Sequence, residues 1–198
     1  MNTKQQSGTM ELSTLDFSKI ALPAVGGHVA YNGAPCEFML SNEDWFQAPF
    51  GAADFKKNVD ATRLSVEFLV SSSPILPTLH QLDKAILQAA IKQKIFPSMS
   101  DAEVASSYHS LLAQAPKYNQ VRLRTKMNLK GLFHVCRFWK SPERSRLNPE
   151  AVVPFLSEKN LRPHCRLQTL WNENGKWGVT LELLNLFVHF PDDGACPF

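Results

Sequence analysis

The sequence predicts a mainly β protein of the α+β class, in which two inserted helices interrupt a series of strands. Three observations lead to this prediction. Several short segments alternate apolar and polar residues with period 2, the stretch at 77–115 places apolar residues three and four positions apart, and an Asn-Gly pair separates two strand-like runs near the end. With 198 residues and 44% hydrophobic composition, the chain is long enough for one domain with a sizeable core.

Two strands are expected in the first third of the chain, in the segments "CEFML" and "RLSVEFLV". In the second segment, every other residue is apolar, namely Leu64, Val66, Phe68 and Val70. Because side chains of a strand point alternately to its two faces, we expect this set to face the core. The acidic and aromatic stretch "NEDWFQAPFGAADF" between the two strands is expected to be a long loop.

The helical pattern begins after "SSSPILP". Apolar residues at helical spacing predict an amphipathic helix from Thr78 to Lys94, with Thr78 as its N-cap. A second helix is expected in "SMSDAEVASSYHSLLAQ", where Ser100 and Glu103 have the spacing of a capping box. Its apolar stripe is Val104, Tyr108, Leu111 and Leu112, which we interpret as a core contact.

The clearest local signal is "RLQTLWNENGKWGVTLELLNLFVHF". Asn174-Gly175 suits a two-residue type I′ turn, because both positions require positive φ. This turn pairs Glu173 with Lys176 and places Trp171 opposite Gly178. A glycine at that position leaves room for the indole to lie across the sheet.

These elements together predict a small Greek-key barrel of the oligonucleotide-binding (OB) type, elaborated by a two-helix insertion at about 77–115. A β-sandwich is the alternative. The expected organisation is a loose N-terminal segment at 1–16, a single OB-like domain at 17–190 and a short acidic C-terminal tip at 191–198.

Charge is distributed unevenly along the chain. The segment from Lys117 to Arg146 contains nine lysines and arginines against one glutamate, a local charge of +8, although the whole chain carries only +3. Charge runs are often no more than solvated surface. In "VRLRTKM", however, Arg122, Arg124 and Lys126 fall on one face of a strand. Like charges so close repel one another unless an anion lies across them, which favours a polyanionic ligand.

The following segment, "LFHVCRFW", is expected to be a strand that carries Phe133, Val135, Arg137 and Trp139 on one side. Strand aromatics are commonly core residues. Aromatic rings among cations, however, are typical of surfaces that bind single-stranded nucleic acid without reading its sequence. The candidate phosphate contacts are Arg122, Arg124, Lys126, Lys130, Arg137 and Lys140, and the candidate stacking residues are Phe133, Trp139, Trp171 and Trp177, the last two near Arg162 and Arg166.

No recognisable catalytic motif is found. The sequence has no phosphate-binding loop, no G-x-G-x-x-G, no G-x-S-x-G and no H-E-x-x-H. The acids Glu43, Asp44, Asp54, Asp60 and Glu67 leave open a metal-dependent nuclease, although their spacing predicts no specific site. We therefore expect a non-enzymatic protein without a cofactor.

The four cysteines, Cys36, Cys136, Cys165 and Cys196, are far apart and form no C-x-x-C pair. They are interpreted as reduced thiols, and neither they nor the scattered histidines predict a metal site. The chain has no signal-peptide pattern and no run of roughly 18 apolar residues, so a cytoplasmic location without membrane contact is expected.

The last seven residues, "DDGACPF", resemble the C-terminal tip of single-stranded-DNA-binding proteins. The bacterial proteins of this function end in an acidic tip that finishes with proline and phenylalanine, matched here by Asp192, Asp193, Pro197 and Phe198. The podovirus-type proteins combine an OB barrel with a similar tail. The resemblance implies that the tip docks replication and repair proteins and competes with DNA for the basic groove. This sequence lacks the long linker and the dense acidic cluster of the bacterial pattern.

The leading hypothesis is therefore sequence-tolerant binding of single-stranded DNA in replication, recombination or repair, in a protein of viral type from a bacterial cytoplasm or an infected host cell. RNA binding is a variant of this hypothesis, and a homo-oligomer is left open. The alternatives are an inhibitor or adaptor module whose basic strands bind an acidic protein, and a metal-dependent nuclease.

Overall fold

The structure is a computed structural model that describes residues 10–53, 62–130 and 133–190. Its helical elements are the α-helices α1 (Leu76–Lys92), α2 (Asp101–Ser107) and α3 (Pro149–Val152) and the 3-10 turns η1 (Leu12–Thr14), η2 (Phe17–Lys19), η3 (Pro116–Tyr118) and η4 (Val153–Glu158). Its strands are β1 (Ile20–Ala21), β2 (Ala30–Tyr31), β3 (Ala34–Met39), β4 (Ala52–Ala53), β5 (Arg63–Leu69), β6 (Leu112–Ala115), β7 (Gln120–Lys130), β8 (Phe133–His134), β9 (Arg137–Ser141), β10 (Arg146–Leu147), β11 (Asn160–Glu173) and β12 (Lys176–His189).

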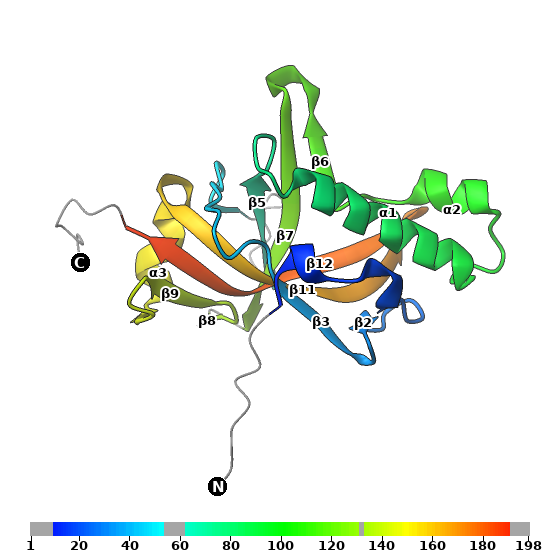
Figure 1. The fold of residues 1–198 in the computed structure, drawn as a ribbon, viewed down its shortest axis with the longest axis horizontal. Coiled ribbons are helices and arrows are strands. Elements are labelled where there is room, and N and C mark those ends of the chain that lie inside the picture. Colours follow the sequence, from blue (N-terminus) through cyan, green and yellow to red (C-terminus); the bar gives the residue numbers. More distant parts are fainter. Residues whose placement is uncertain (1–9, 54–61, 131–132, 191–198) are drawn as a thin grey trace, which may run out of the picture.

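Five long strands form the body of the fold, in the spatial order β3-β11-β12-β7-β5 (Figure 1). Their neighbours are antiparallel except for β12 and β7, which run parallel where Glu182 pairs with Lys126. The strands therefore follow a Greek-key path, and α3 with η4 connects β10 to β11. The expected fold class, an OB-type α+β fold with inserted helices, is confirmed.

The inserted helices lie against one side of the long β11–β12 hairpin (Figure 1). Helix α1 buries Leu79, Leu82, Ile86 and Ala90, which have the helical spacing on which the prediction of an amphipathic helix rests. The helix begins earlier than expected, however. Its N-cap is Ile75, which makes no side-chain cap bond, and Pro77 occupies the first turn, where its missing N–H costs nothing. Thr78 is therefore a helical residue and the predicted N-cap is wrong.

Helix α2 begins with the predicted capping box. The Ser100 hydroxyl accepts the Glu103 backbone N–H at 3.3 Å, and the Glu103 carboxylate accepts the Ser100 backbone N–H at 2.7 Å. The helix ends at Ser107, so Leu111 and Leu112 do not continue its stripe. Both are buried, Leu111 immediately before β6 and Leu112 as its first residue, and β6 pairs with β7.

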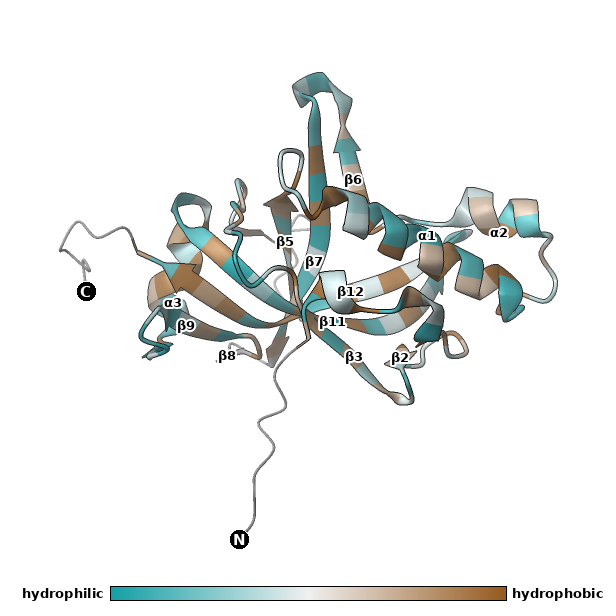
Figure 2. Ribbon diagram, in the orientation of Figure 1, coloured by the Kyte–Doolittle hydropathy of each residue, from teal (hydrophilic) through white to brown (hydrophobic). Residues whose placement is uncertain are grey.

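The core fills the space enclosed by the strands and beneath the helices. Its largest fully buried side chains include Phe38, Phe46, Phe68 and Phe138. Hydrophobic and hydrophilic residues alternate along the strands, as Figure 2 shows. Cys36, Cys136 and Cys165 are buried free thiols, and burial raises the pKa of Cys36 to about 12. Cys196 lies outside the described residues.

The β11–β12 hairpin has the predicted register. Asn174 and Gly175 have φ angles of 52° and 70°, Glu173 pairs with Lys176, and Trp171 pairs with Gly178. The hairpin register shifts between His164 and Cys165 and again between Leu167 and Leu170. These two irregularities bend a hairpin of 14-residue strands.

Two further sequence predictions need correction. The segment "LFHVCRFW" is not one strand: β8 pairs with β7, whereas β9 pairs with β10 and β12, and Val135 and Cys136 lie between them. The predicted loose N-terminal segment at 1–16 is also wrong for the described residues near its end, because Leu12 is fully buried and Glu11 bridges to Met39. Residues 1–9 lie outside the described part of the chain.

No helix in the described ranges is long and apolar enough to span a membrane.

Candidate functional site

The outer face of β7 carries the predicted cations. Arg122, Arg124 and Lys126 are partly exposed there, whereas Leu123, Thr125 and Met127 on the opposite face are at most 2% exposed. The alternation of the sequence therefore separates a charged outer face from the core, as period 2 requires.

A cleft of about 440 Å³ lies on this outer face. It is open to solvent and brings together residues of β5, β7 and the β11–β12 hairpin with the connection from α2 to β6. Three of the predicted binding residues line it: Arg124, Lys126 and Trp171. The other lining residues are Ser65, Glu67, His109, Ser110, Leu111, Thr125, Val179, Thr180 and Leu181.

Arg124 is held in the cleft by two neutral acceptors. Its Nη1 donates to the carbonyl of Ser110 at 3.0 Å and lies 2.8 Å from Nε2 of His109. Burial, followed by the nearby charges of Arg124 and Lys176, lowers the pKa of His109, although Asp83 opposes the shift. The imidazole is therefore neutral at pH 7, and among the described residues no carboxylate forms an ion pair with Arg124. Its charge therefore faces the cleft without a direct ion pair, and the carboxylate nearest in the register, Glu67, pairs with Arg122 instead.

Arg122 differs from Arg124, because its charge is already paired. Its Nη1 lies 2.8 Å from the Glu67 carboxylate, and both side chains are less than one-fifth exposed. The guanidinium also stacks on Phe50, with 4.9 Å between its carbon and the ring centroid. Lys126 donates from Nζ to the Ser65 hydroxyl at 2.5 Å.

Trp171 forms one wall of the cleft. It lies opposite Gly178, where a Cβ atom would come within 2.7 Å of Cζ2 of the indole. The ring of His109 packs beside it, with 5.7 Å between the ring centroids. The expected function of the glycine, which is to make room for the indole, is confirmed.

Trp177 is not part of the cleft. It pairs with Asn172, the residue after Trp171, and therefore faces the opposite side of the hairpin. Its ring is 1% exposed, packs against Phe96 and Tyr108, and donates from Nε1 to the carbonyl of Val104 at 2.8 Å. The prediction that Trp177 stacks on a ligand is wrong, because the inserted helices cover it.

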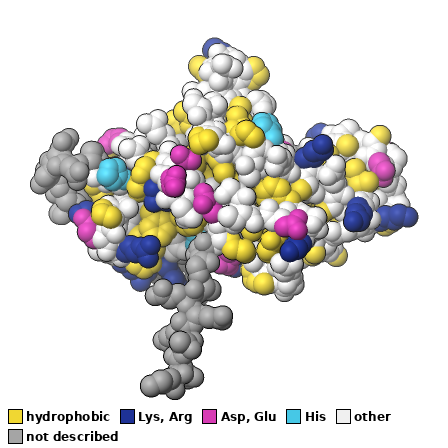
Figure 3. Space-filling model, viewed as in Figure 1, with side chains coloured by type: hydrophobic (Ala, Val, Ile, Leu, Met, Phe, Trp, Pro, Cys, Tyr) yellow, Lys and Arg dark blue, Asp and Glu magenta, His cyan; other side chains and the backbone are white. Residues whose placement is uncertain are grey.

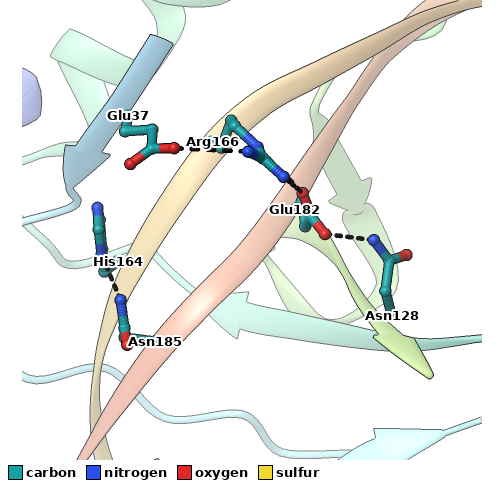
Figure 4. Close-up of polar contacts among 6 residues, drawn as sticks. All are labelled: Glu37, Asn128, His164, Arg166, Glu182 and Asn185. Atoms are coloured by element: carbon teal, nitrogen blue, oxygen red, sulfur yellow. Dashed lines mark hydrogen bonds and ion pairs between the residues drawn. The ribbon is translucent and has the colours of Figure 1, made fainter. Parts of the chain in front are cut away.

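Figure 4 shows a row of polar contacts that runs from Glu37 through Arg166 and Glu182 to Asn128. Arg166 donates from Nη2 to the buried Glu182 carboxylate at 2.6 Å and lies 3.5 Å from Glu37. Asn128 donates to the other oxygen of Glu182. Because two carboxylates pair with Arg166, it stabilises the row and has little unpaired charge for a ligand.

The remaining predicted residues lie beyond this row. Arg137 is exposed, Trp139 is partly exposed, and Lys140 pairs with Glu143 at 3.2 Å. Arg162 stacks on Trp45, with 4.2 Å from guanidinium to ring centroid, and donates to the carbonyl of Glu43. The side chains of Lys130 and Phe133 lie outside the description, as do all four tip residues, Asp192, Asp193, Pro197 and Phe198.

Sequence reasoning missed several residues of the site. His109 and Ser110 come from a segment interpreted as helix, and Phe50 and Trp45 from a segment interpreted only as a loop. The acidic and aromatic composition of that loop was a signal, but it did not indicate which cation each ring would contact.

In the described residues, no group of three or more His, Cys, Asp or Glu side chains is placed to hold a metal ion.

Comparison with known proteins identifies the fold. No protein-family model and no curated protein sequence matches the chain. Solved structures of the single-stranded DNA-binding protein from bacteriophage Enc34 are similar. A C-terminally truncated form has 11% identity and a TM-score of 0.50, covering 88% of this chain and 95% of that one. A complex with single-stranded DNA has 10% identity and a TM-score of 0.47, covering 88% and 97%. The truncated form shows a shared fold, and at this level the predicted resemblance is confirmed.

Proposed function

We propose that the protein binds single-stranded DNA without sequence preference and without catalysing a reaction. The observation that carries the proposal is the cleft in which Trp171 meets Arg124 and Lys126. An aromatic face beside cations binds a base by stacking and its phosphates by charge. Every base offers a π-face and every nucleotide a phosphate, so such a site tolerates any sequence.

The position of the cleft supports this function. OB-type barrels bind oligonucleotides on the face of their second and third strands, flanked by the loops after the first and fourth strands. Counting β3, β5, β7, β11 and β12 as the five barrel strands, β5 and β7 are the second and third. Trp171 lies close to the turn between the fourth and fifth strands, and Phe50 lies in the loop after the first. The cleft therefore occupies the expected face.

The charges of the cleft support a choice among the proposed phosphate contacts. Arg124 is oriented by His109 and Ser110, so it meets a phosphate without first losing an ion pair. Arg122 and Arg166 are paired with carboxylates and contribute less. We therefore assign the main phosphate contact to Arg124, with Lys126 beside it and Lys130 as a further contact along β7.

The biological setting is part of the same proposal. We infer a role in DNA replication, recombination or repair, in a bacterial cytoplasm or in a host cell infected by a virus. The truncated phage protein with the same fold is described as a single-stranded DNA-binding protein, which supports this setting. The tip at 191–198 is proposed to recruit partner proteins through Asp192, Asp193, Pro197 and Phe198.

Titration with labelled oligo-dT tests the function. We expect binding that weakens steeply with salt, because each neutralised phosphate of a single strand adds about −0.7 to the log–log slope. Oligo-rU in place of oligo-dT tests RNA binding, and a duplex of equal length is the control, whose bases are not open to stacking. Affinity for oligo-dT that does not change with salt would contradict the proposal. Binding of an acidic protein but of neither polymer would support the adaptor alternative.

A further inference from the structure

A second group of cations and aromatic rings lies on the outer face at the far end of β12. Arg146 on β10 pairs with Trp139 on β9, and Trp139 pairs with Phe187 on β12. Paired residues on neighbouring strands point to the same face, so these three side chains form a row. Arg137, two positions before Trp139, shares that face. We call Arg137, Trp139, Arg146 and Phe187 the β9 patch.

The β9 patch is accessible and positively charged. Arg137 and Arg146 are exposed, and Trp139 and Phe187 are partly exposed. Within the described ranges, neither arginine forms an ion pair with a carboxylate. On the side of the molecule seen in Figure 3, basic side chains gather beside hydrophobic ones in the region that Figure 1 labels β8 and β9. The patch therefore combines unpaired positive charge with aromatic surface.

The indole of Trp139 is fixed in position. Its Nε1 donates to Oδ1 of Asn185 at 3.0 Å, and Nδ2 of Asn185 lies 2.7 Å from Nδ1 of His164. Burial lowers the pKa of His164, so its ring is neutral and Nδ1 accepts the Asn185 N–H. Because this chain anchors the indole edge to β11 and β12, little side-chain entropy is lost when a ligand stacks on the ring.

We propose that the β9 patch is a second nucleotide-stacking site, so that one DNA strand occupies the cleft and the patch together. This inference rests on the proposed function. Trp171 lies opposite Gly178 and Trp139 beside Phe187, nine residues along β12. At about 3.3 Å per residue, these two positions on β12 are at most about 30 Å apart along the strand. A strand near the upper end of the roughly 4–16 nucleotides bound per OB fold covers both sites.

The surface between the two sites permits this path. The outer residues of β11 and β12 there are His164 and Asn185, which are neutral, and Arg166 and Glu182, which neutralise each other. Glu37 also pairs with Arg166. The two carboxylates share one guanidinium, so this stretch carries a net charge of −1, which Arg124 at one end and Arg137 and Arg146 at the other outweigh.

Oligonucleotides of two lengths test the proposal. Labelled oligo-dT of about 6 nucleotides fits the cleft, and oligo-dT of about 16 nucleotides reaches both sites. We expect Trp139→Ala to weaken binding of the longer strand about 5- to 150-fold, the equivalent of one stacked base, and to leave the shorter strand unchanged. Trp171→Ala should weaken both. Trp139→Phe retains a ring and should keep most of the affinity.

Arg146→Ala is an independent test of the second site, because Arg146 is exposed and its replacement does not disturb the core. It should reduce the salt slope for the longer strand by about 0.7. If Trp139→Ala and Arg146→Ala both bind the longer strand with wild-type affinity, the proposal of a second site is overturned. The proposed role of the cleft is then unaffected. If Arg146→Ala weakens binding of the longer strand but Trp139→Ala does not, the proposal that a base stacks on Trp139 is overturned. Failure of the wild-type protein to bind either length would instead overturn the proposed function.

Discussion

Arg124 and His109 lie 2.8 Å apart, from Nη1 to Nε2, and come from elements that the sequence does not place together. A guanidinium can only donate, so Nε2 of His109 accepts and its proton resides on Nδ1. Three groups around the ring carry charge: Arg124 and Lys176 oppose its protonation, and Asp83 favours it. The pair therefore connects the protonation of His109 to the orientation of a phosphate-binding arginine.

We predict that His109 titrates below its usual pKa of 6.5. Because folding lowers this pKa, the stability that the neutral ring contributes is present above pH 6.5 and is lost as pH falls through the lowered value. An NMR titration of the histidine ring carbons measures the pKa directly, and Arg124→Ala should raise it. A pKa of His109 at or above 6.5 in the wild-type protein would show that the ring does not accept from Arg124.

Arg124→Ala should weaken binding of all oligonucleotide sequences alike and reduce the salt slope by about 0.7, because it removes one phosphate contact. Lys92→Ala, an exposed position on α1, is the matched control and should leave the slope unchanged. Salt titrations with oligo-dT and a mixed sequence measure both. Selective loss for one sequence would indicate base recognition instead.

Gly178→Ala should disturb the cleft wall. The added methyl would lie 2.7 Å from the Trp171 ring and 2.9 Å from the carbonyl of His109, so the backbone or the indole must move. We expect a loss of about 1–3 kcal/mol in the free energy of unfolding, as is typical of overpacking. Urea denaturation measures this. Combining the change with Trp171→Ala should recover part of the loss, and strict additivity of the two changes would argue against the contact.

Arg166→Met should destabilise the fold by roughly 3 kcal/mol, because it leaves the carboxylate of Glu182, itself only 2% exposed, without its cation. Arg63→Met, at an exposed position on β5, is the control and should change stability by less than about 0.5 kcal/mol. Thermal and urea unfolding compare the two variants. An Arg166→Met protein as stable as the control would mean that water, not Arg166, satisfies Glu182.

The parts of the fold that local rules determine were predictable from sequence. The Asn174-Gly175 turn fixes the hairpin register by itself, and the Ser100–Glu103 box fixes the start of α2. Polar and apolar residues alternate along β7, and this local pattern points Arg124 away from the core. In each case the chemistry within a few residues decides the conformation.

The site itself depends on tertiary contacts that periodicity does not contain. The hairpin register places Trp171 and Trp177 on opposite faces, but only the placement of the inserted helices decides which face is covered and which forms the cleft. The break between β8 and β9 arises because two strands share the edge of β12. Likewise, whether an arginine is free or paired depends on partners distant in sequence, as with Arg122 and Glu67.

Tryptophan fluorescence of the wild-type protein and Trp171→Phe tests the central claim most directly. Phenylalanine retains a stacking ring but removes the reporter from the cleft. We predict that oligo-dT quenches the wild-type emission and that Trp171→Phe still binds, by polarisation of a labelled strand, with a smaller quench. The buried Trp177 should contribute little, since it is 1% exposed. Equal quenching in the two proteins would contradict the account, because the base would then not stack on Trp171.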